Sequence, residues 1–188
     1  MKAFAKNKLI NLNVTIDKKA TAKRISELIH KFGKPIDQLL DSFNVMDKQA
    51  IYYWMSEKNG GISIEKAKLL AVYMGIDIDD IIIFKGDEPK EVIQKYKRIE
   101  KNIAISLDYM ISSEKTGEKI TQLMREKNCS VKELAEIMGV SETTVRNWKK
   151  GTLPKWPKLK KLSIVFGVKM NDIIKVRKDG AEGMMNIF

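Results

Sequence analysis

The stretch LAEIMGVSETTVRNWKKG, residues 134–151, decides the fold of this chain. Its apolar residues recur every three or four positions on both sides of Gly139, which predicts two short helices with one buried face each. Gly139 lies where a tight turn requires a positive φ angle. Ser141 is suited to cap the second helix, and Gly151 to end it. The stretch therefore predicts a helix, a tight turn and a second helix.

The surrounding sequence extends this pattern to five short helices. Ser130 and Glu133 form an S-x-x-E capping box, which marks the start of the helix before the turn. Apolar residues continue at helical spacing on both sides of the central stretch. The five expected helices are residues 117–127, 131–138, 142–149, 157–166 and 170–175.

The same pattern occurs a second time, earlier in the chain, from Ile25 onward. The earlier copy needs one extra residue in its middle turn and two more after Trp54, and turns tolerate such insertions. The order and length of the agreement predict a duplicated helical domain. Ile25, Leu28, Leu39, Phe43, Val45, Ile51, Trp54, Leu70, Gly75, Asp80, Ile81 and Ile82 match Ile120, Leu123, Leu134, Met138, Val140, Val145, Trp148, Leu162, Gly167, Asp172, Ile173 and Ile174, respectively.

These two copies divide the chain into five expected segments. Within the segment between the copies, residues 88–113 read as one long helix with an apolar stripe. That helix is either a spacer packed on its own domains or the seam of a dimer. The segments are an N-terminal arm at 1–21, the first domain at 22–86, a helical linker at 87–115, the second domain at 116–177 and a C-terminal tail at 178–188.

Positive charge is concentrated in the second half of the chain. The formal net charge is +11, from 35 Lys and Arg against 24 Asp and Glu. Residues 1–94 contribute +2 of that excess, and residues 95–188 contribute +9. Lysines and arginines that neutralise phosphates release condensed counterions, so such an excess indicates a polyanionic partner. The second copy is the better candidate for binding it.

Several functional classes are disfavoured by composition. Cys129 and His30 are the only cysteine and histidine, so neither a zinc finger nor a Cys/His catalytic site is expected. No Gly-rich phosphate loop, catalytic dyad or metal-binding constellation is present, and we expect no enzyme activity, cofactor or metal. Without an apolar run of about 20 residues, no membrane contact is expected either. The lysine-interrupted N-terminus is a poor signal peptide, which predicts a cytoplasmic protein.

The central stretch, together with LPxxPxLxKLSxxFGVxxNDII at residues 153–174, resembles the XRE family of helix-turn-helix regulators, which includes the phage lambda-type repressors. DKQAIYYWM, residues 47–55, resembles the same family more weakly. The resemblance implies an all-α fold of two lambda-repressor-like five-helix domains joined by a long helical linker. It also implies a sequence-specific transcriptional regulator, by family habit a repressor, that places helix 142–149 in the major groove of double-stranded DNA.

The resemblance also assigns roles to individual side chains of the second copy. Four are expected to face base edges, because Asn can bond adenine, Glu can accept from cytosine N4, Arg can take guanine and a Thr methyl can touch thymine. Others would meet phosphates and fix the register of the protein on DNA. The base readers are Glu142, Thr143, Arg146 and Asn147, and the phosphate contacts are Lys132, Ser141, Thr144, Lys149, Lys150, Lys155 and Lys158.

The first copy offers a second DNA site or a surface for a protein partner. Lys48, Gln49, Tyr52 and Tyr53 take the positions equivalent to the four base readers, whereas Trp54 is expected in the core. A homodimer through helix 88–113 or the first domain is a further expectation. The alternative function is a protein-interaction module, such as an antitoxin or a mobile-element accessory factor, that binds DNA to position a partner.

Overall fold

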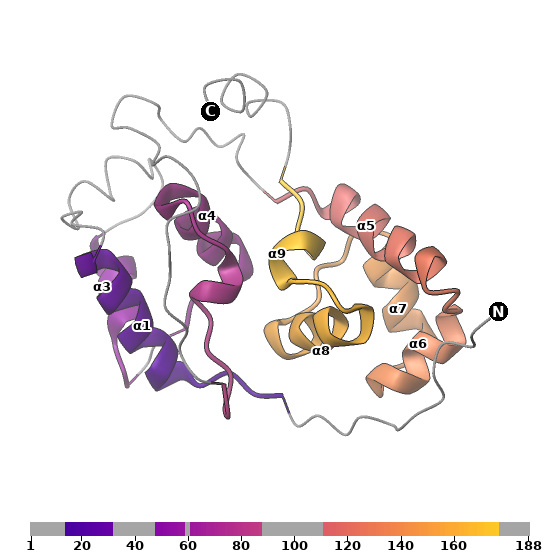
Figure 1. Cartoon of the computed structure of the whole chain (residues 1–188), viewed down its shortest axis with the longest axis horizontal. Coiled ribbons are helices and arrows are strands. Elements are labelled where there is room, and N and C mark those ends of the chain that lie inside the picture. The colour runs from indigo at the N-terminus through magenta and orange to yellow at the C-terminus, as the bar shows by residue number, and fades with distance from the viewer. Residues whose placement is uncertain (1–13, 32–47, 59–60, 88–110, 177–188) are drawn as a thin grey trace, which may run out of the picture. The chain divides into compact units, whose positions relative to one another are not determined.

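The computed structural model describes residues 14–31, 48–58, 61–87 and 111–176, which divide between two compact units (Figure 1). The described part of the first unit is residues 15–31, 48–58 and 61–87, and that of the second is Val14 with residues 111–176. In these ranges the regular structure is helical, apart from two isolated β-bridges. The described residues are therefore all-α, as predicted. The expected linker helix falls almost entirely at 88–110, outside them.

The second unit contains five helices, two of which have the predicted bounds. The first of the five begins at Ser113, four residues before the predicted start, because the Ser112 hydroxyl caps it by accepting from the Lys115 amide at 3.2 Å. Ile111 and Ser112 are extended, so the predicted helix 88–113 is wrong at its C-terminal end. The helices are α5 Ser113–Glu126, α6 Val131–Met138, α7 Glu142–Lys149, α8 Trp156–Phe166 and α9 Met170–Ile173.

The core of the second unit is formed by the apolar faces that the spacing predicted. Each of its helices contributes at least one side chain that is almost completely removed from water. Burial of this kind is the main favourable term in folding, because apolar surface leaves water. The buried residues include Ile120, Leu123, Leu134, Met138, Val145, Trp148, Leu159, Leu162, Phe166 and Ile173.

A short antiparallel contact closes the second unit by joining its two ends. Ile111 pairs with Val176, and the Ser112 amide donates to the Lys175 carbonyl at 2.8 Å. The Lys175 amide donates in turn to the hydroxyl of Thr116, a side chain only 1% exposed. These bonds satisfy backbone groups that would otherwise be unpaired next to the core.

The first unit contains three described α-helices and one short 3-10 helix, coloured indigo to magenta in Figure 1. Its first helix begins at Lys18, within the last residues of the segment 1–21 that the sequence assigned to an N-terminal arm. Ile51 and Trp54 are buried, as expected. The elements are α1 Lys18–Lys31, α3 Lys48–Met55, α4 Ile64–Met74 and η1 Ile78–Asp80.

The ends of the first unit are closed by the same kind of contact as those of the second. Ile16 pairs with Phe84, and the Asp17 amide donates to the Ile83 carbonyl at 2.9 Å. The Ile83 amide donates to the hydroxyl of Thr21, which is 5% exposed. The buried threonine therefore lies five residues after the bridging isoleucine in both units.

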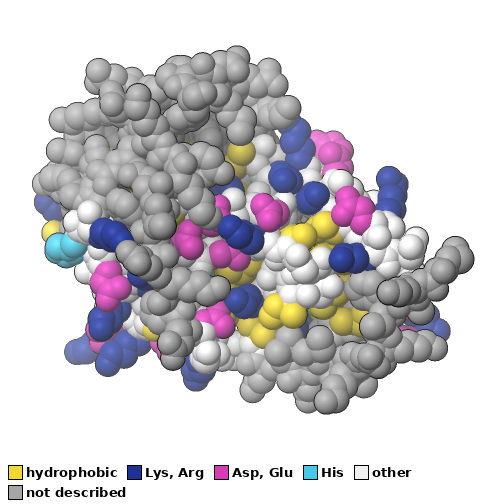
Figure 2. Space-filling view, viewed as in Figure 1, with side chains coloured by type: hydrophobic (Ala, Val, Ile, Leu, Met, Phe, Trp, Pro, Cys, Tyr) yellow, Lys and Arg dark blue, Asp and Glu magenta, His cyan; other side chains and the backbone are white. Residues whose placement is uncertain are grey.

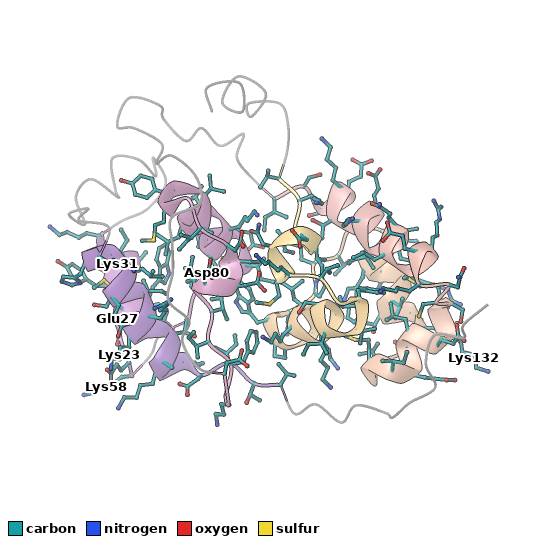
Figure 3. All side chains as sticks on the ribbon, viewed as in Figure 1. Lys23, Glu27, Lys31, Lys58, Asp80 and Lys132 are labelled. Carbon is teal, nitrogen blue, oxygen red and sulfur yellow. The ribbon has the colours of Figure 1, made fainter. Side chains whose placement is uncertain are left out.

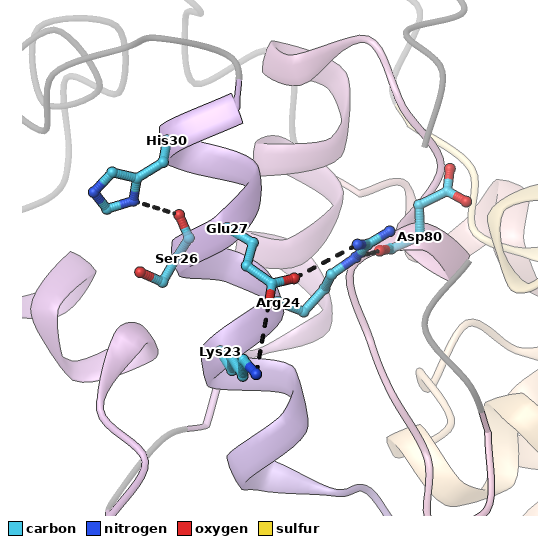
Figure 4. Close-up of polar contacts among 6 residues, drawn as sticks. All are labelled: Lys23, Arg24, Ser26, Glu27, His30 and Asp80. Carbon is cyan, nitrogen blue, oxygen red and sulfur yellow. Dashed lines mark hydrogen bonds and ion pairs between the residues drawn. The ribbon is translucent and has the colours of Figure 1, made fainter. Parts of the chain in front are cut away.

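Helix α1 of the first unit is also joined to η1 by a charged side chain (Figure 4). The Arg24 guanidinium donates to the Asp80 carbonyl at 3.0 Å and lies 3.8 Å from the Glu27 carboxylate. Lys23 lies 4.0 Å from the same carboxylate. Two of the cations of α1 therefore make contacts within the unit.

The backbones of α5 and α7 meet at Gly117, a residue to which the sequence pattern assigned no role. A Cβ atom at Gly117 would lie 2.6 Å from the Lys149 carbonyl oxygen and 2.9 Å from the Trp148 carbonyl oxygen and the Gly151 amide nitrogen. Gly151 itself adopts φ +105° against the backbone of Ser113. Only glycine fits at Gly117, because every atom in the way belongs to the backbone.

We predict that Gly117→Ala destabilises the second unit by about 1–3 kcal/mol, because α5 and α7 must separate to admit one methyl group. Alanine is otherwise the better helix former, by about 1 kcal/mol, so the sign of the change identifies the close approach. Urea unfolding followed by circular dichroism measures it. Glu118→Ala, at the next and exposed position of α5, is the control. A gain in stability for Gly117→Ala would show that the helices are not in contact there.

Candidate nucleic-acid interface

The turn between α6 and α7 has the left-handed geometry that the sequence predicted. Gly139 adopts φ 61° and ψ 49°, and its amide donates to the Glu136 carbonyl at 3.2 Å. The following amide, of Val140, donates to the Ala135 carbonyl at 3.0 Å. These bonds close the end of α6 and fix the direction in which the chain enters α7.

The start of α6 is held by the predicted capping box. The Ser130 amide donates to the Glu133 carboxylate at 2.8 Å, and the Glu133 amide donates to the Ser130 hydroxyl at 3.2 Å. Both contacts satisfy amides that lack a partner within the helix. The prediction of this box is confirmed.

Helix α7 is capped by Ser141, whose side chain has a structural role. Its hydroxyl accepts from the Thr144 amide at 3.2 Å and lies 2.9 Å from the Thr144 hydroxyl. Ser141 and Thr144 were both expected at phosphates. In this structure their hydroxyl groups contact each other and stabilise the first turn of α7.

The inner and outer faces of α7 separate as the spacing predicted. Val145 and Trp148 are buried, at 0% and 4% exposure. Thr143, Arg146 and Asn147 are exposed, and Glu142 is half-buried. The four expected base readers therefore share the outer side of a short helix whose inner side is held in the core.

Glu142 and Arg146 form an ion pair along this outer side. The carboxylate Oε2 lies 2.5 Å from the guanidinium Nη2, one helical turn away. The side chains are 41% and 56% exposed, respectively. Sequence reasoning treated Glu142 and Arg146 as separate readers, although their i, i+4 spacing is typical of such pairs.

The expected phosphate-binding lysines differ in how free they are to reach DNA. Lys150 and Lys155 are exposed, and Lys149 is half-buried. Lys132 is exposed on the first turn of α6 and extends away from the helix (Figure 3). These four side chains place positive charge on α6, at the end of α7 and at the start of α8.

Lys158 has a different environment from the other expected phosphate contacts. Its ammonium group donates to the Met138 carbonyl at 3.2 Å, at the C-terminal end of α6. Burial, with a smaller contribution from the nearby ammonium group of Lys161, lowers the pKa of Lys158. Lys158 therefore joins α8 to α6 in this structure. Lys160 and Lys161, which were not among the expected phosphate contacts, add charge to the same helix.

Cys129 is a packing residue with an unreactive thiol. It is 6% exposed, and burial raises the pKa of its thiol to about 11, with a smaller contribution from the Glu133 carboxylate. The thiolate is the reactive form, so such a group reacts slowly near neutral pH. Among the described residues, no cluster of three or more His, Cys, Asp or Glu side chains could hold a metal ion.

Helix α3 of the first unit carries the residues that the sequence aligned with the four expected base readers of α7. The residues around them differ from those around α7. Lys48 and Gln49 are exposed, and Tyr52 and Tyr53 are 52% and 50% exposed. On the view of Figure 2, basic and acidic side chains are interspersed. In the register that the predicted repeat implies, Met55, Ser56 and Ser63 stand where the second unit has Lys149, Lys150 and Lys155.

The two units also differ in total charge. Residues 15–87 contain 11 Lys and Arg and 11 Asp and Glu, whereas residues 111–176 contain 14 and 7. In the first unit Lys19 lies 3.3 Å from the Glu57 carboxylate, near the end of α3. The first unit therefore has much less positive charge available for phosphates.

We predict that Ser141→Ala lowers the free energy of unfolding of the second unit by about 1 kcal/mol, because the Thr144 amide loses its acceptor. Ser141→Asn should restore most of the loss, since Asn is an equally good N-cap. Chemical denaturation of the three proteins checks this expectation. Equal stability of the alanine variant and the unchanged protein would mean that the cap contributes nothing.

Comparison with known proteins agrees with this local geometry. Residues 119–179 match the family model of the Cro/C1-type HTH DNA-binding domain, which covers less than half of the chain. No curated protein and no solved structure is significantly similar to this chain. No helix among the described residues is long and apolar enough to span a bilayer. The second unit thus contains a helix-turn-helix of the Cro/C1 type, which indicates a DNA-binding regulator.

Proposed function

We propose that the second unit binds operator DNA by placing α7 in the major groove. The observation that carries this proposal is the outer side of α7, where Thr143, Arg146 and Asn147 are exposed on a helix held rigidly from within. A short polar helix that follows a tight turn is the element with which this class of domain reads base edges. The Cro/C1-type match over residues 119–179 supports the same conclusion.

Base readout and phosphate contact are assigned to different side chains in this proposal. Asn147 and Thr143 meet base edges, Asn147 through adenine and Thr143 through the thymine methyl. Lys132, Lys149, Lys150 and Lys155 meet phosphates and set the register. Lys158 is left out of the phosphate set, because its ammonium group already bonds the end of α6. Ser141 and Thr144 contribute by capping α7.

The regulator is proposed to be a repressor, since the XRE resemblance favours repression over activation. A conventional repressor of this type covers two half-sites about one helical turn, roughly 34 Å, apart. A second α7 would come from a second copy of the chain. Residues 88–113, the proposed dimer seam, lie almost wholly outside the described residues.

The first unit is proposed to be a second copy of the same domain. Both units close through an isoleucine bridge and a buried threonine, and α3 and α7 are both eight residues long. Helices α4 and α8 are both eleven residues long and both end at a left-handed glycine, Gly75 and Gly167. These shared details support a tandem repeat.

The first unit is proposed to bind a protein partner. Its α3 exposes two tyrosines, and the positions that match Lys149, Lys150 and Lys155 in the predicted repeat hold no lysine. Tyrosine supplies contact area at low entropic cost and is enriched at protein interfaces. This assignment also fits the alternative function, an antitoxin or a mobile-element accessory factor, in which DNA binding positions a partner.

We predict that Lys150→Ala weakens binding to specific and random duplexes alike and reduces the slope of log K against log salt by about one unit. Asn147→Ala should instead cost about 1–3 kcal/mol on the preferred duplex only, because one base contact is lost. Fluorescence anisotropy at several salt concentrations, on a duplex selected from a random library, separates the two effects. Lys58→Ala, an exposed lysine of the first unit, is the charge-matched control (Figure 3). Equal losses for Asn147→Ala on both duplexes would contradict direct readout.

For the first unit, we predict that replacing Tyr52 and Tyr53 together by serine changes DNA affinity less than twofold. The reason is that α3 lacks the phosphate-binding lysines that accompany α7. The same anisotropy assay, with a duplex long enough for two half-sites, measures the change. A loss of tenfold or more would contradict the protein-partner assignment and make α3 a second DNA reader.

A further inference from the structure

The acidic residue at the start of α7 requires an explanation if this helix approaches DNA. Glu142 occupies the first helical position, where a carboxylate would face a polyanion and raise the free energy of binding. A carboxylate can also stabilise a helix N-terminus, but the Thr144 amide already has the Ser141 hydroxyl as its acceptor. A cationic partner on the same side of the helix would be a second reason for a carboxylate at this position.

The structure supplies that reason in the contact with Arg146. The carboxylate Oε2 and the guanidinium Nη2 are in direct contact, on the same outer side of the helix. The pair carries no net charge, so Glu142 does not present an uncompensated negative charge to phosphates. It also limits the freedom of an exposed arginine side chain, which would otherwise have to be ordered on binding.

The contact leaves most of the guanidinium available. Arginine has five N–H donors in a planar fork, and Glu142 takes one of the terminal nitrogens. The remaining donors suffice for a bidentate contact to O6 and N7 of guanine, the commonest specific contact in the major groove. The neighbouring residue Asn147 lies on the same exposed side and can contact an adjacent base.

We propose that Glu142 is a positioning residue for Arg146, and that the two side chains together read a single guanine. This inference rests on the proposed function of the second unit and deepens it. Glu142 then makes no independent contact with cytosine, which revises the role expected from the sequence. The operator half-site contains a G·C pair opposite the first two turns of α7.

A double-mutant cycle on DNA binding tests the proposal. The proteins are the unchanged chain, Glu142→Ala, Arg146→Ala and the double variant, measured on the selected duplex and on duplexes with each G·C pair replaced in turn. We expect Arg146→Ala to lose about tenfold or more in affinity and all discrimination at one G·C pair. Glu142→Ala should lose severalfold at that same pair, and the double variant should be no worse than Arg146→Ala alone.

Glu136→Gln is the matched control, since it removes one exposed acid from the neighbouring helix α6 without touching Arg146. It should raise affinity slightly and equally on all duplexes. Circular dichroism of each variant separates loss of contact from loss of helix. Lys150→Ala tests DNA binding itself. This variant should lose affinity for every duplex, whatever the role of Glu142.

Three outcomes would overturn the proposal. If Glu142→Ala changes the preference at a different base pair, and the affinity losses of Glu142→Ala and Arg146→Ala multiply in the double variant, Glu142 is an independent reader. If Glu142→Ala behaves like Glu136→Gln, its carboxylate only repels phosphates. If Arg146→Ala changes no base preference while Lys150→Ala still weakens binding, the pair does not read bases. Failure of the unchanged protein to bind any duplex would instead reject the proposed function itself, and the paired readout with it.

Discussion

The backbone contact at Gly117 is the constraint on which the second unit depends. Because that residue has no side chain, α5 approaches the carbonyl groups at the end of α7 more closely than a Cβ atom would allow. Val145 and Trp148 can then fill the core from the same helix. The orientation of α7, and with it the exposure of its outer side, follows from this contact. A recognition helix held only by exposed residues would lack such a defined direction.

Sequence patterns predicted the helix-turn-helix closely because its signals are local. Gly139 must be left-handed, Ser130 and Ser141 must cap, and the apolar spacing assigns each helix one inner face. All of these depend on residues within a few positions of one another. The bounds of α6 and α7 accordingly agree with prediction to the residue. Residue types and spacing also placed the exposed side of α7.

Contacts between distant residues were not predictable in the same way. Gly117 looked like an ordinary helical glycine, and its close neighbours lie more than thirty positions later. The bridge between Ile111 and Val176 joins the two ends of the second unit, and no local pattern encodes it. The bond from Lys158 to the Met138 carbonyl has the same character, and it removes one cation from the expected phosphate set. Each of these contacts depends on tertiary packing between residues far apart in the sequence.

The two units share several structural details and carry different surfaces. Both keep the closing bridge, the buried threonine and a buried tryptophan, which maintain the fold. The outward positions are free to change, because no core contact depends on them. In the second unit the outward positions of α7 hold polar side chains followed by lysines, and in the first those of α3 hold two tyrosines on a unit with balanced charge. Since phosphate attraction supplies most non-specific affinity, we expect a unit without such lysines to bind DNA more weakly than one that has them.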